Sequence, residues 1–217
     1  MGKVVAIDGP AGSGKGTVAK ILAEECNLTY IDTGAMYRAI AYSCLQNGID
    51  ITEEDKIIEL AKNSKIDFIN GKTYLNNVDV SEEIRTMEVT RIVSPISSIV
   101  KLREILVEMQ RDMAGDKDVI MEGRDITTVV FPNATYKFYL DATLAERTNR
   151  RYKENIEKGM NVTKEEIKEN ISKRDYNDMN KEVGALIRTE DSVYIDSTDL
   201  TIEEVVLKIK GIIGKWF

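Results

Sequence analysis

The chain has 217 residues, 42% of them hydrophobic, which is enough to bury a full core in one domain or at most two. Its net charge of −7, from 30 basic and 37 acidic residues, disfavours long nucleic acid and anionic membranes as main partners. The absence of His excludes a histidine general base and a histidine-ligated metal ion.

No segment has the pattern of an export signal or a membrane span. The first residues lead directly into a strand-like apolar run, without the long apolar stretch and cleavage site of a signal peptide. No apolar run approaches the length that a membrane-spanning helix needs. Cys26 and Cys44 lie on helix-like stretches, which indicates reduced thiols in a reducing compartment. We therefore expect a cytoplasmic protein.

The first predicted strand, residues 3–7, leads into a glycine-rich loop. The pattern G-x-x-x-x-G-K fits from Gly9 to Lys15, although Gly16 stands where Ser or Thr is usual and Thr17 follows it. The glycines let successive N–H groups point inward, Lys15 adds a positive charge, and the next helix directs its positive end at the same place. A simple glycine-rich turn would not explain Lys15. We predict a nucleoside triphosphate site made of Gly9, Pro10, Ala11, Gly12, Ser13, Gly14, Lys15, Gly16 and Thr17.

Five short apolar runs predict strands, with helical patterns between them. They are residues 3–7, 29–31, 118–121, 137–140 and 192–195. This β-α-β order predicts a parallel sheet covered on both faces. Each run ends at or next to a carboxylate, namely Asp8, Asp32, Glu122, Asp141 and Asp196. These side chains either cap turns and helices, or hold Mg²⁺ directly or through water at the edge where such sheets bind ligands.

The stretch from residue 48 to residue 93 has a different pattern. Apolar and polar residues alternate from Lys65 to Val80 around Asn70-Gly71, which is a strong signal for a β-hairpin. An antiparallel hairpin in a parallel-sheet protein indicates an insertion into the core. A helix is predicted after it, from Ile99 to Met113.

Two later helical stretches are rich in charge. The first, Glu146–Lys158, is basic on one side and is broken by Lys158-Gly159. Alone it would be interpreted as a solvated helix with ion pairs one turn apart, but it follows a strand at the ligand-binding edge of the sheet. The second, Lys164–Lys181, places Arg174 and Asp178 one turn apart on one face.

Five segments resemble the bacterial cytidylate kinases, which belong to the nucleoside monophosphate kinase family of P-loop kinases. They are the loop at residues 9–17, I-D-T-G-A-M-Y-R at 31–38, D-V-S-E-E-I-R at 79–85, E-G-R-D-I-T-T-V-V-F-P at 122–132, and Arg174-Asp175 with Asp178. The resemblance keeps its register over essentially the whole chain.

The resemblance implies an α/β fold with a P-loop kinase core, whose five-stranded parallel sheet is covered by helices. A monophosphate-binding insert with an antiparallel hairpin and a helical lid complete it. The core of this single domain, 1–217, is expected at about 1–47, 94–142 and 182–217, the insert at about 48–93, and the lid with the following helix at about 143–181. The implied reaction is phosphoryl transfer from ATP to CMP or dCMP, with Mg²⁺, by a monomer.

Site residues are transferred by position in the same way. Phosphoryl transfer is assigned to Lys15, Arg124, Arg147, Arg150 and Arg151. Arg38 and Arg124 are expected to hold the acceptor phosphate, Ser94, Arg103 and Asp125 the cytosine, and Arg174 and Asp178 the ribose, while Thr33 and Lys181 complete the substrate site. A carboxylate with an arginine can serve both the amino group and the acceptors of cytosine, whereas uracil would turn a carbonyl toward the carboxylate.

Two further expectations concern the metal and the lid. Mg²⁺ is expected on the phosphates of ATP and on water, with the Thr17 hydroxyl as a candidate ligand. The lid arginines lie far along the chain from Lys15, so we expect them to reach the phosphates only when their helix moves toward the loop.

The chain departs from the family pattern at three places. Lys181 stands where Arg is common, which keeps the charge but loses the planar two-pronged contact. Gly184-Ala185-Leu186 stands where a Pro is common. Thr33 replaces a frequent Ser and keeps the hydroxyl.

Two other functions remain open from the sequence. One is a related kinase that acts on UMP, AMP or a non-nucleotide hydroxyl. The other is a guanine-nucleotide switch, which needs Asn-Lys-x-Asp after a late strand, whereas Asn180-Lys181 is followed by Glu182-Val183. Asp112–Gly115 matches the D-x-x-G pattern of such switches, but it ends a helix pattern instead of a strand.

Overall fold

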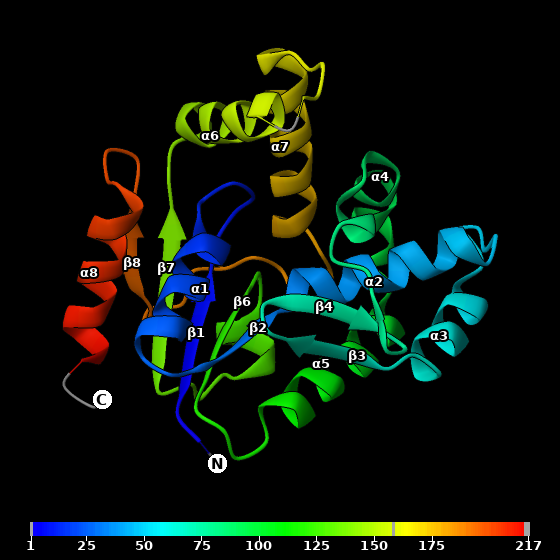
Figure 1. Ribbon diagram of the computed structural model, residues 1–217, viewed down its shortest axis with the longest axis horizontal. Coiled ribbons are helices and arrows are strands. Elements are labelled where there is room, and N and C mark those ends of the chain that lie inside the picture. The colour runs from blue at the N-terminus through cyan, green and yellow to red at the C-terminus, as the bar shows by residue number, and fades with distance from the viewer. Residues whose placement is uncertain (1, 158, 215–217) are drawn as a thin grey trace.

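The core of the molecule is a five-stranded parallel sheet. The computed structural model describes residues 2–157 and 159–214. The strands are β1 (Val4–Asp8), β2 (Thr29–Asp32), β6 (Val119–Gly123), β7 (Tyr136–Asp141) and β8 (Val193–Asp196), in the spatial order β2-β6-β1-β7-β8 (Figure 1). All five strands predicted from the apolar runs are confirmed, with ends shifted by one or two residues.

Alternate side chains of these strands enter two separate cores. Val5 and Ile7 pack under α1 (Lys15–Glu25) and α8 (Ile202–Ile213) on one face. Val4 and Ala6 pack on the other face under α5 (Val100–Ala114) and the π-helical turn η2 (Ile126–Val130). Because the strands are buried on both faces, they are continuous apolar runs in the sequence.

The predicted insertion forms a small sheet and several helices beside α2 (Thr33–Gln46). In chain order it contains α3 (Glu54–Lys62), β3 (Ile66–Ile69), β4 (Lys72–Leu75), β5 (Val78–Asp79), the 3₁₀ turn η1 (Glu83–Arg85) and α4 (Met87–Ile96). β3 and β4 form the predicted hairpin, and both turn residues, Asn70 and Gly71, have positive φ, as a two-residue hairpin turn requires. The third strand, β5, was not predicted. The expected boundary after residue 93 falls inside α4.

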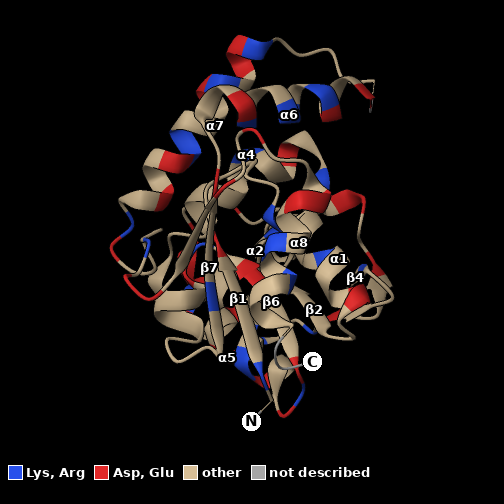
Figure 2. Cartoon of the chain, turned by 90° about the vertical axis from the view of Figure 1, so that its left-hand side faces the viewer, with Lys and Arg blue, Asp and Glu red and all other residues tan. Residues whose placement is uncertain are grey.

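Two charged helices stand above the carboxyl end of β7. They are α6 (Leu144–Glu157) and α7 (Lys164–Met179), which pack on each other and carry interspersed acidic and basic residues (Figures 1 and 2). A capping box between Thr163 and Glu166 starts α7. The helix ends at Met179, so Lys181 lies beyond it. Of the predicted break after α6, Gly159 has a φ of 72°, and Lys158 lies outside the described residues.

Within residues 2–157 and 159–214, no helix combines the length and the apolar character that crossing a membrane requires.

Candidate functional site

The glycine-rich loop joins β1 to α1 as predicted. Gly12 and Gly14 have φ values of 79° and 89°, which favour glycine, and Gly14 is the N-cap of α1. The Lys15 side chain is buried; its Nζ donates to the Pro10 carbonyl at 3.0 Å and lies 3.9 Å from Oε2 of Glu122. A Cβ on Gly16 would lie 3.2 Å from Oε1 of Glu122. The glycine at this position therefore gives the Glu122 carboxylate room beside the loop.

Lys15 and Glu122 influence each other's ionisation. Burial, together with the charge of Arg124, lowers the pKa of Lys15, while Glu122 acts in the opposite direction. Burial and the nearby Asp32 raise the pKa of Glu122. A polyphosphate next to Lys15 would favour its charged form, so binding of such an anion is coupled to the protonation of this pair.

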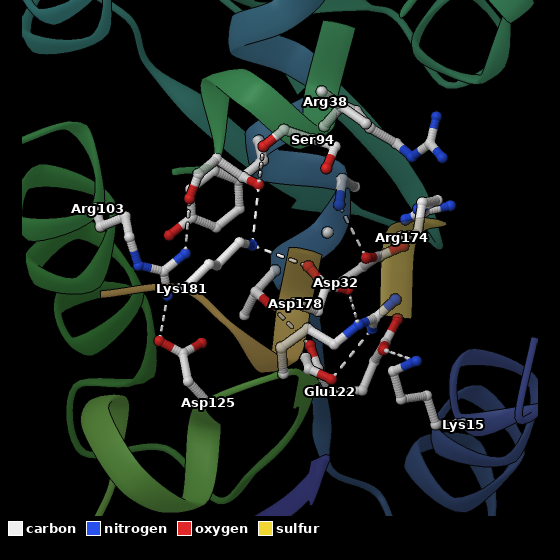
Figure 3. Close-up of a pocket in the computed structure, with 18 of the residues that line it drawn as sticks. Lys15, Asp32, Arg38, Ser94, Arg103, Glu122, Asp125, Arg174, Asp178 and Lys181 are labelled. Atoms are coloured by element: carbon white, nitrogen blue, oxygen red, sulfur yellow. Dashed lines mark hydrogen bonds and ion pairs between the residues drawn. The ribbon is translucent and has the colours of Figure 1, made fainter. Parts of the chain in front are cut away.

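A pocket of about 190 Å³ opens beside Lys15. All nine residues assigned to the substrate line it, although they come from α2, α4, α5, α7, the end of β6 and the segment after α7. They are Thr33, Arg38, Ser94, Arg103, Arg124, Asp125, Arg174, Asp178 and Lys181. Arg103 and Asp125 lie at one end, and Arg38, Arg174 and Lys15 lie at the other (Figure 3).

The first end of the pocket contains a buried ion pair. Arg103 pairs with Asp125, donates to the Ser97 carbonyl at 2.9 Å, and its guanidinium carbon lies 5.5 Å from the centre of the Tyr37 ring. The Nε of Arg103 is buried without a hydrogen-bond partner. Protein atoms cover this donor, so a ligand would reach it only if the Arg103 side chain shifted.

The segment after α7 closes the same end of the pocket. Gly184, with a φ of 70°, lies so close to Arg103 and Asp125 that a Cβ would collide with both side chains. Lys181 donates to the Ser97 hydroxyl at 3.0 Å and to Asp178 at 2.9 Å. Of the two departures from the family pattern, Gly184 lies against the ion pair, and Lys181 contacts Ser97, whose carbonyl accepts from Arg103.

Asp178 occupies the middle of the pocket. It accepts from Nε of Arg124 at 2.8 Å and from Lys181, and these charges hold its pKa well below the usual range although burial opposes them. Nearby, Asn177 donates to the Ser94 hydroxyl at 3.2 Å. The carboxylate of Asp178 is therefore ionised at neutral pH.

The second end of the pocket is positively charged. Arg38 and Arg174 form no ion pair with any carboxylate among the residues that the structure describes. Burial, with the charge of Arg174, lowers the pKa of Arg38 to about 9. Burial, with the charge of Arg124, lowers the pKa of Arg174 to about 10. Arg85 is 3.5 Å from Asp32 and also lines this end. An anionic group bound here would neutralise charges that now repel one another.

The three arginines assigned to the lid lie differently from one another. Arg147 donates to the Ala11 carbonyl at 2.9 Å and Arg150 to the Ser13 carbonyl at 3.4 Å, so both already contact the phosphate loop without the expected movement of the helix. Arg151 pairs with Glu154 at 2.7 Å and is partly exposed. None of the three lines the pocket.

Most strand-end carboxylates serve as caps. Asp8 accepts from the backbone of Ile126 and Thr127, and Asp32 accepts from the Ala35 amide at the start of α2. Asp141 and Asp196 accept from the amides of Ala142 and Thr198. Across the described part of the chain, no group of three or more acidic or cysteine side chains is arranged to hold a metal ion.

Several residues around the site were not assigned roles from the sequence. Tyr37 and Arg85 lie within the quoted motifs, next to Arg38 and before Thr86. Their place in these motifs was the only indication of a role at the site. Nothing in the sequence indicated a role for Ser97, because its carbonyl and hydroxyl meet Arg103 and Lys181 only in the folded structure. Asp175 followed Arg174 in a motif, and its contact with the loop depends on how α7 packs.

Comparison with known proteins gives a consistent match. The family model described as cytidylate kinase matches residues 5–215. The cytidylate kinase of Clostridioides difficile (strain 630) is 50% identical over 206 residues, which cover 95% of both chains. That of Alkaliphilus oremlandii (strain OhILAs) is 51% identical over 205 residues, which cover 94% of both chains.

Solved structures show the same fold at low sequence identity. A shikimate kinase from Bacteroides thetaiotaomicron superposes with a TM-score of 0.51 at 10% identity, covering 98% of both chains. An uncharacterized protein from Eubacterium ventriosum superposes with a TM-score of 0.54 at 14% identity and the same coverage. These likenesses support the predicted α/β architecture of P-loop kinases.

Proposed function

The chain belongs to the cytidylate kinase family, and from this premise we propose that it transfers the γ-phosphoryl group of ATP to CMP or dCMP, giving ADP and CDP or dCDP. One observation carries the proposal. Nine residues from separate elements line a single pocket that has a buried ion pair at one end, free cations at the other, and the lysine of the phosphate loop beside the cations. The order of charged groups along the pocket thus matches a ligand with a polar base and an anionic phosphate.

The first end of the pocket suits cytosine. The ring nitrogen and carbonyl of cytosine accept hydrogen bonds, and the Arg103 guanidinium provides donors at this end. The 4-amino group donates, and the Asp125 carboxylate accepts. Ser94 adds a hydroxyl at this end. With uracil, a carbonyl would face the carboxylate, so the same groups would discriminate against UMP.

The remaining pocket residues suit the ribose and the acceptor phosphate. We assign Asp178 to the ribose, and Arg38 and Arg124 to the phosphate, with Thr33 and Lys181 beside them. Arg174, expected at the ribose, lies with Arg38 at the cationic end, where it can also contact the phosphate. The Thr33 hydroxyl donates to the Glu122 carbonyl at 2.8 Å, and Lys181 holds Asp178, so both also orient their neighbours. Arg124 lies between Asp178 and the loop, where it would contact the group in transfer.

Catalysis in this arrangement rests on position and charge. The N–H groups of the loop and Lys15 bind the donor phosphates, and Arg124 and Arg151 are assigned to the negative charge that develops on the transferred phosphoryl group. Arg147 and Arg150 act from the loop side. The acceptor is already an anion at neutral pH, so no side chain needs to act as an obligatory general base.

The donor site fits a magnesium ion that is bound mainly by the nucleotide. Its preferred ligands are oxygens, and the described side chains near Lys15 offer the exposed Thr17 hydroxyl and the Glu122 and Asp32 carboxylates. Such a small set leaves most of the coordination to ATP phosphates and water. When bound, Mg²⁺ would neutralise part of the negative charge on the phosphates.

We further propose that the enzyme is a monomer of the cytoplasm. Cys26 and Cys44 are free thiols, as expected in a reducing compartment. Sedimentation of the purified protein tests the oligomeric state.

The decisive experiment is a coupled assay with ATP and a panel of CMP, dCMP, UMP and AMP. We expect kcat/KM for CMP to exceed that for UMP by on the order of 10²-fold, less than in a fully dry site built around the same groups. Equal values for CMP and UMP would contradict the assignment of cytosine selectivity. Tight nucleotide binding without transfer to any monophosphate would instead favour a binding module.

A further inference from the structure

Two successive peptide groups of the phosphate loop, Pro10–Ala11 and Ala11–Gly12, are each held by one member of a pair of charged residues. The Ala11 amide donates to Oδ1 of Asp175 at 3.1 Å, and the Ala11 carbonyl accepts from Nη1 of Arg147 at 2.9 Å. The same Arg147 nitrogen contacts Oδ2 of Asp175, and Nε of Arg147 donates to the Ala142 carbonyl at 2.9 Å. Ala11, Arg147 and Asp175 are all buried. Arg147 lies on α6 and Asp175 on α7, so the pair joins both helices to the loop.

The loop is shaped to let α6 come this close. A Cβ on Gly12 would lie 3.3 Å from Cβ and from the carbonyl oxygen of Arg147, which is tighter than ordinary packing. Gly12 also has a φ of 79°. The glycine therefore serves the approach of the helix backbone as well as the turn of the loop.

Three carbonyls of the loop each accept from a cationic side chain. Pro10 accepts from Lys15, Ala11 from Arg147 and Ser13 from Arg150. In a planar trans peptide the C=O of one residue and the N–H of the next point in opposite directions. Asp175 on the Ala11 N–H therefore also fixes the Pro10 carbonyl, and Arg147 on the Ala11 carbonyl also fixes the Gly12 N–H. Carbonyl oxygens turned toward a polyphosphate would repel it, whereas N–H groups attract it. Side chains that hold the carbonyls thus decide how well the loop receives an anion.

We propose that Arg147 and Asp175 are a positioning pair: they fix the orientation of the two peptide groups that flank the Ala11 Cα and so set the affinity of the loop for the donor nucleotide. The proposal deepens the proposed function and rests on it, because the donor is taken to be ATP. The pair acts through the loop backbone, and neither residue lines the pocket, although the charge of Asp175 acts on the lining residues Arg124 and Arg174.

The pair should affect the binding of ATP and the binding of CMP differently. Asp175 is one residue after Arg174 and three before Asp178, both of which line the acceptor pocket. Asp178 nevertheless has its own partners, Arg124 and Lys181, which do not depend on Asp175. Loss of the pair should therefore weaken ATP binding and leave CMP binding unchanged, whereas a general loss of structure would weaken both.

The test uses two conservative variants and a matched control. Asp175→Asn keeps an oxygen for the Ala11 amide but sets an amide donor against the Arg147 guanidinium. Arg147→Lys keeps the charge, but one ammonium cannot serve two carbonyls and a carboxylate in the same geometry. Lys164→Ala is the control, because Lys164 on α7 donates to Asn149 on α6 at 2.9 Å, which is a contact between the same helices that does not touch the loop.

Two measurements separate this proposal from the proposed function. Hydrogen exchange of the Ala11 amide in the nucleotide-free protein tests the pair without any substrate. Titration calorimetry gives Kd for ATP and for CMP separately. For Asp175→Asn we expect faster exchange at Ala11 and an ATP Kd raised about ten- to hundredfold, since a charge-assisted hydrogen bond is lost. The CMP Kd and the control variant should match the wild type, and Arg147→Lys should show a smaller change in the same direction.

The following results would contradict the positioning role of Arg147 and Asp175. An unchanged ATP Kd with faster Ala11 exchange would overturn the positioning role. Parallel weakening of ATP and CMP binding, or the same effect in Lys164→Ala, would reduce the pair to a structural contact. If Asp175→Asn does not fold, Arg147→Lys is judged by these criteria. A wild-type protein that binds no ATP would refute the proposed function, while the exchange measurement would still report on the pair.

Discussion

At the scale of single residues, the positive side chains around the loop fall into two groups. Some already have a carboxylate or a carbonyl of the loop as partner, and others have neither. Arg103 and Arg124 are paired with carboxylates, and Arg147 and Arg150 contact carbonyls of the loop. Arg174 has neither kind of partner among the described residues, and Arg38 contacts only a carbonyl and a hydroxyl. An incoming phosphate thus meets preformed positive charge at one end of the pocket without first breaking an ion pair.

The first prediction concerns base selectivity. Asp125→Asn replaces the acceptor for the cytosine amino group by an amide that can turn its donor outward. We expect kcat/KM for CMP to fall and the difference between CMP and UMP to narrow. Assays with both monophosphates on the variant give the ratio directly. A preserved ratio would move the discrimination to Arg103, whose pairing with Asp125 the substitution also alters.

The second prediction concerns pH. Lys15 attracts phosphate only when protonated, so kcat/KM for ATP should fall as pH rises through its pKa in the free enzyme. Burial lowers this pKa and Glu122 raises it, so Glu122→Gln should lower it further. The descending limb of the pH profile should therefore begin at lower pH in the variant.

A matched control removes the same charge farther away. Glu24→Gln neutralises an exposed carboxylate on α1, the helix that begins at Lys15. Its pH profile should coincide with that of the wild type. A limb that stays in place in Glu122→Gln, or moves equally in both variants, would show that Glu122 does not control the ionisation of Lys15.

At the scale of elements, local patterns predicted what local interactions determine. The five strands followed from buried apolar runs, and the hairpin from Asn70-Gly71. The strand β5 escaped because it has two residues, Val78 and Asp79, after a second turn at Asn76-Asn77 with positive φ at both. So short a strand has no periodicity to detect.

Contacts between elements were beyond the reach of the sequence for a physical reason. Asp175 and Arg147 are typical of solvated helix faces when only their own helices are considered. They are buried only because α6 and α7 pack on the loop, across 164 and 136 positions of the chain from Ala11. The nine residues expected at the substrate lie around one pocket. Motif resemblance could indicate this because it contains such tertiary information, which residue type and spacing alone do not.

The third prediction belongs to helix α6. Arg151 is partly exposed, and its charge is felt by Arg38 and Arg174 in the pocket. Arg151→Ala should reduce kcat more than it weakens CMP binding, if closure of the helix brings this side chain to the phosphates. Lys153→Ala, an exposed cation on the same helix, is the control. Unchanged kcat and CMP affinity in Arg151→Ala would make this face of α6 a solvated surface.

At the scale of the whole molecule, the insertion shares its hydrophobic core with the rest of the protein. One cluster contains Ile40 of α2 and Leu102 and Leu106 of α5 together with Ile57 of α3 and Val89 of α4. A second cluster, on the far face of the sheet, contains Ile209 of α8. Since α2 and α5 belong both to the sheet region and to the first cluster, we propose that the chain is one domain that unfolds as a unit.

The last prediction tests this unity with two equivalent truncations. Ile57 and Ile209 are both fully buried, one in the insertion and one on the opposite side of the sheet. Replacing either by Ala should cost about 2–5 kcal/mol of unfolding free energy, from lost burial and the cavity left behind. In one cooperative unit, each substitution should lower a single calorimetric transition, with equal calorimetric and van't Hoff enthalpies. Native-state hydrogen exchange should then show amides of β1 and of α4 losing the same protection in Ile57→Ala as in Ile209→Ala. A separate calorimetric transition at lower temperature in Ile57→Ala, with the amides of β1 still fully protected from exchange, would instead show that the insertion unfolds alone. Closure over the monophosphate would then involve local unfolding of the insertion and not the movement of packed helices.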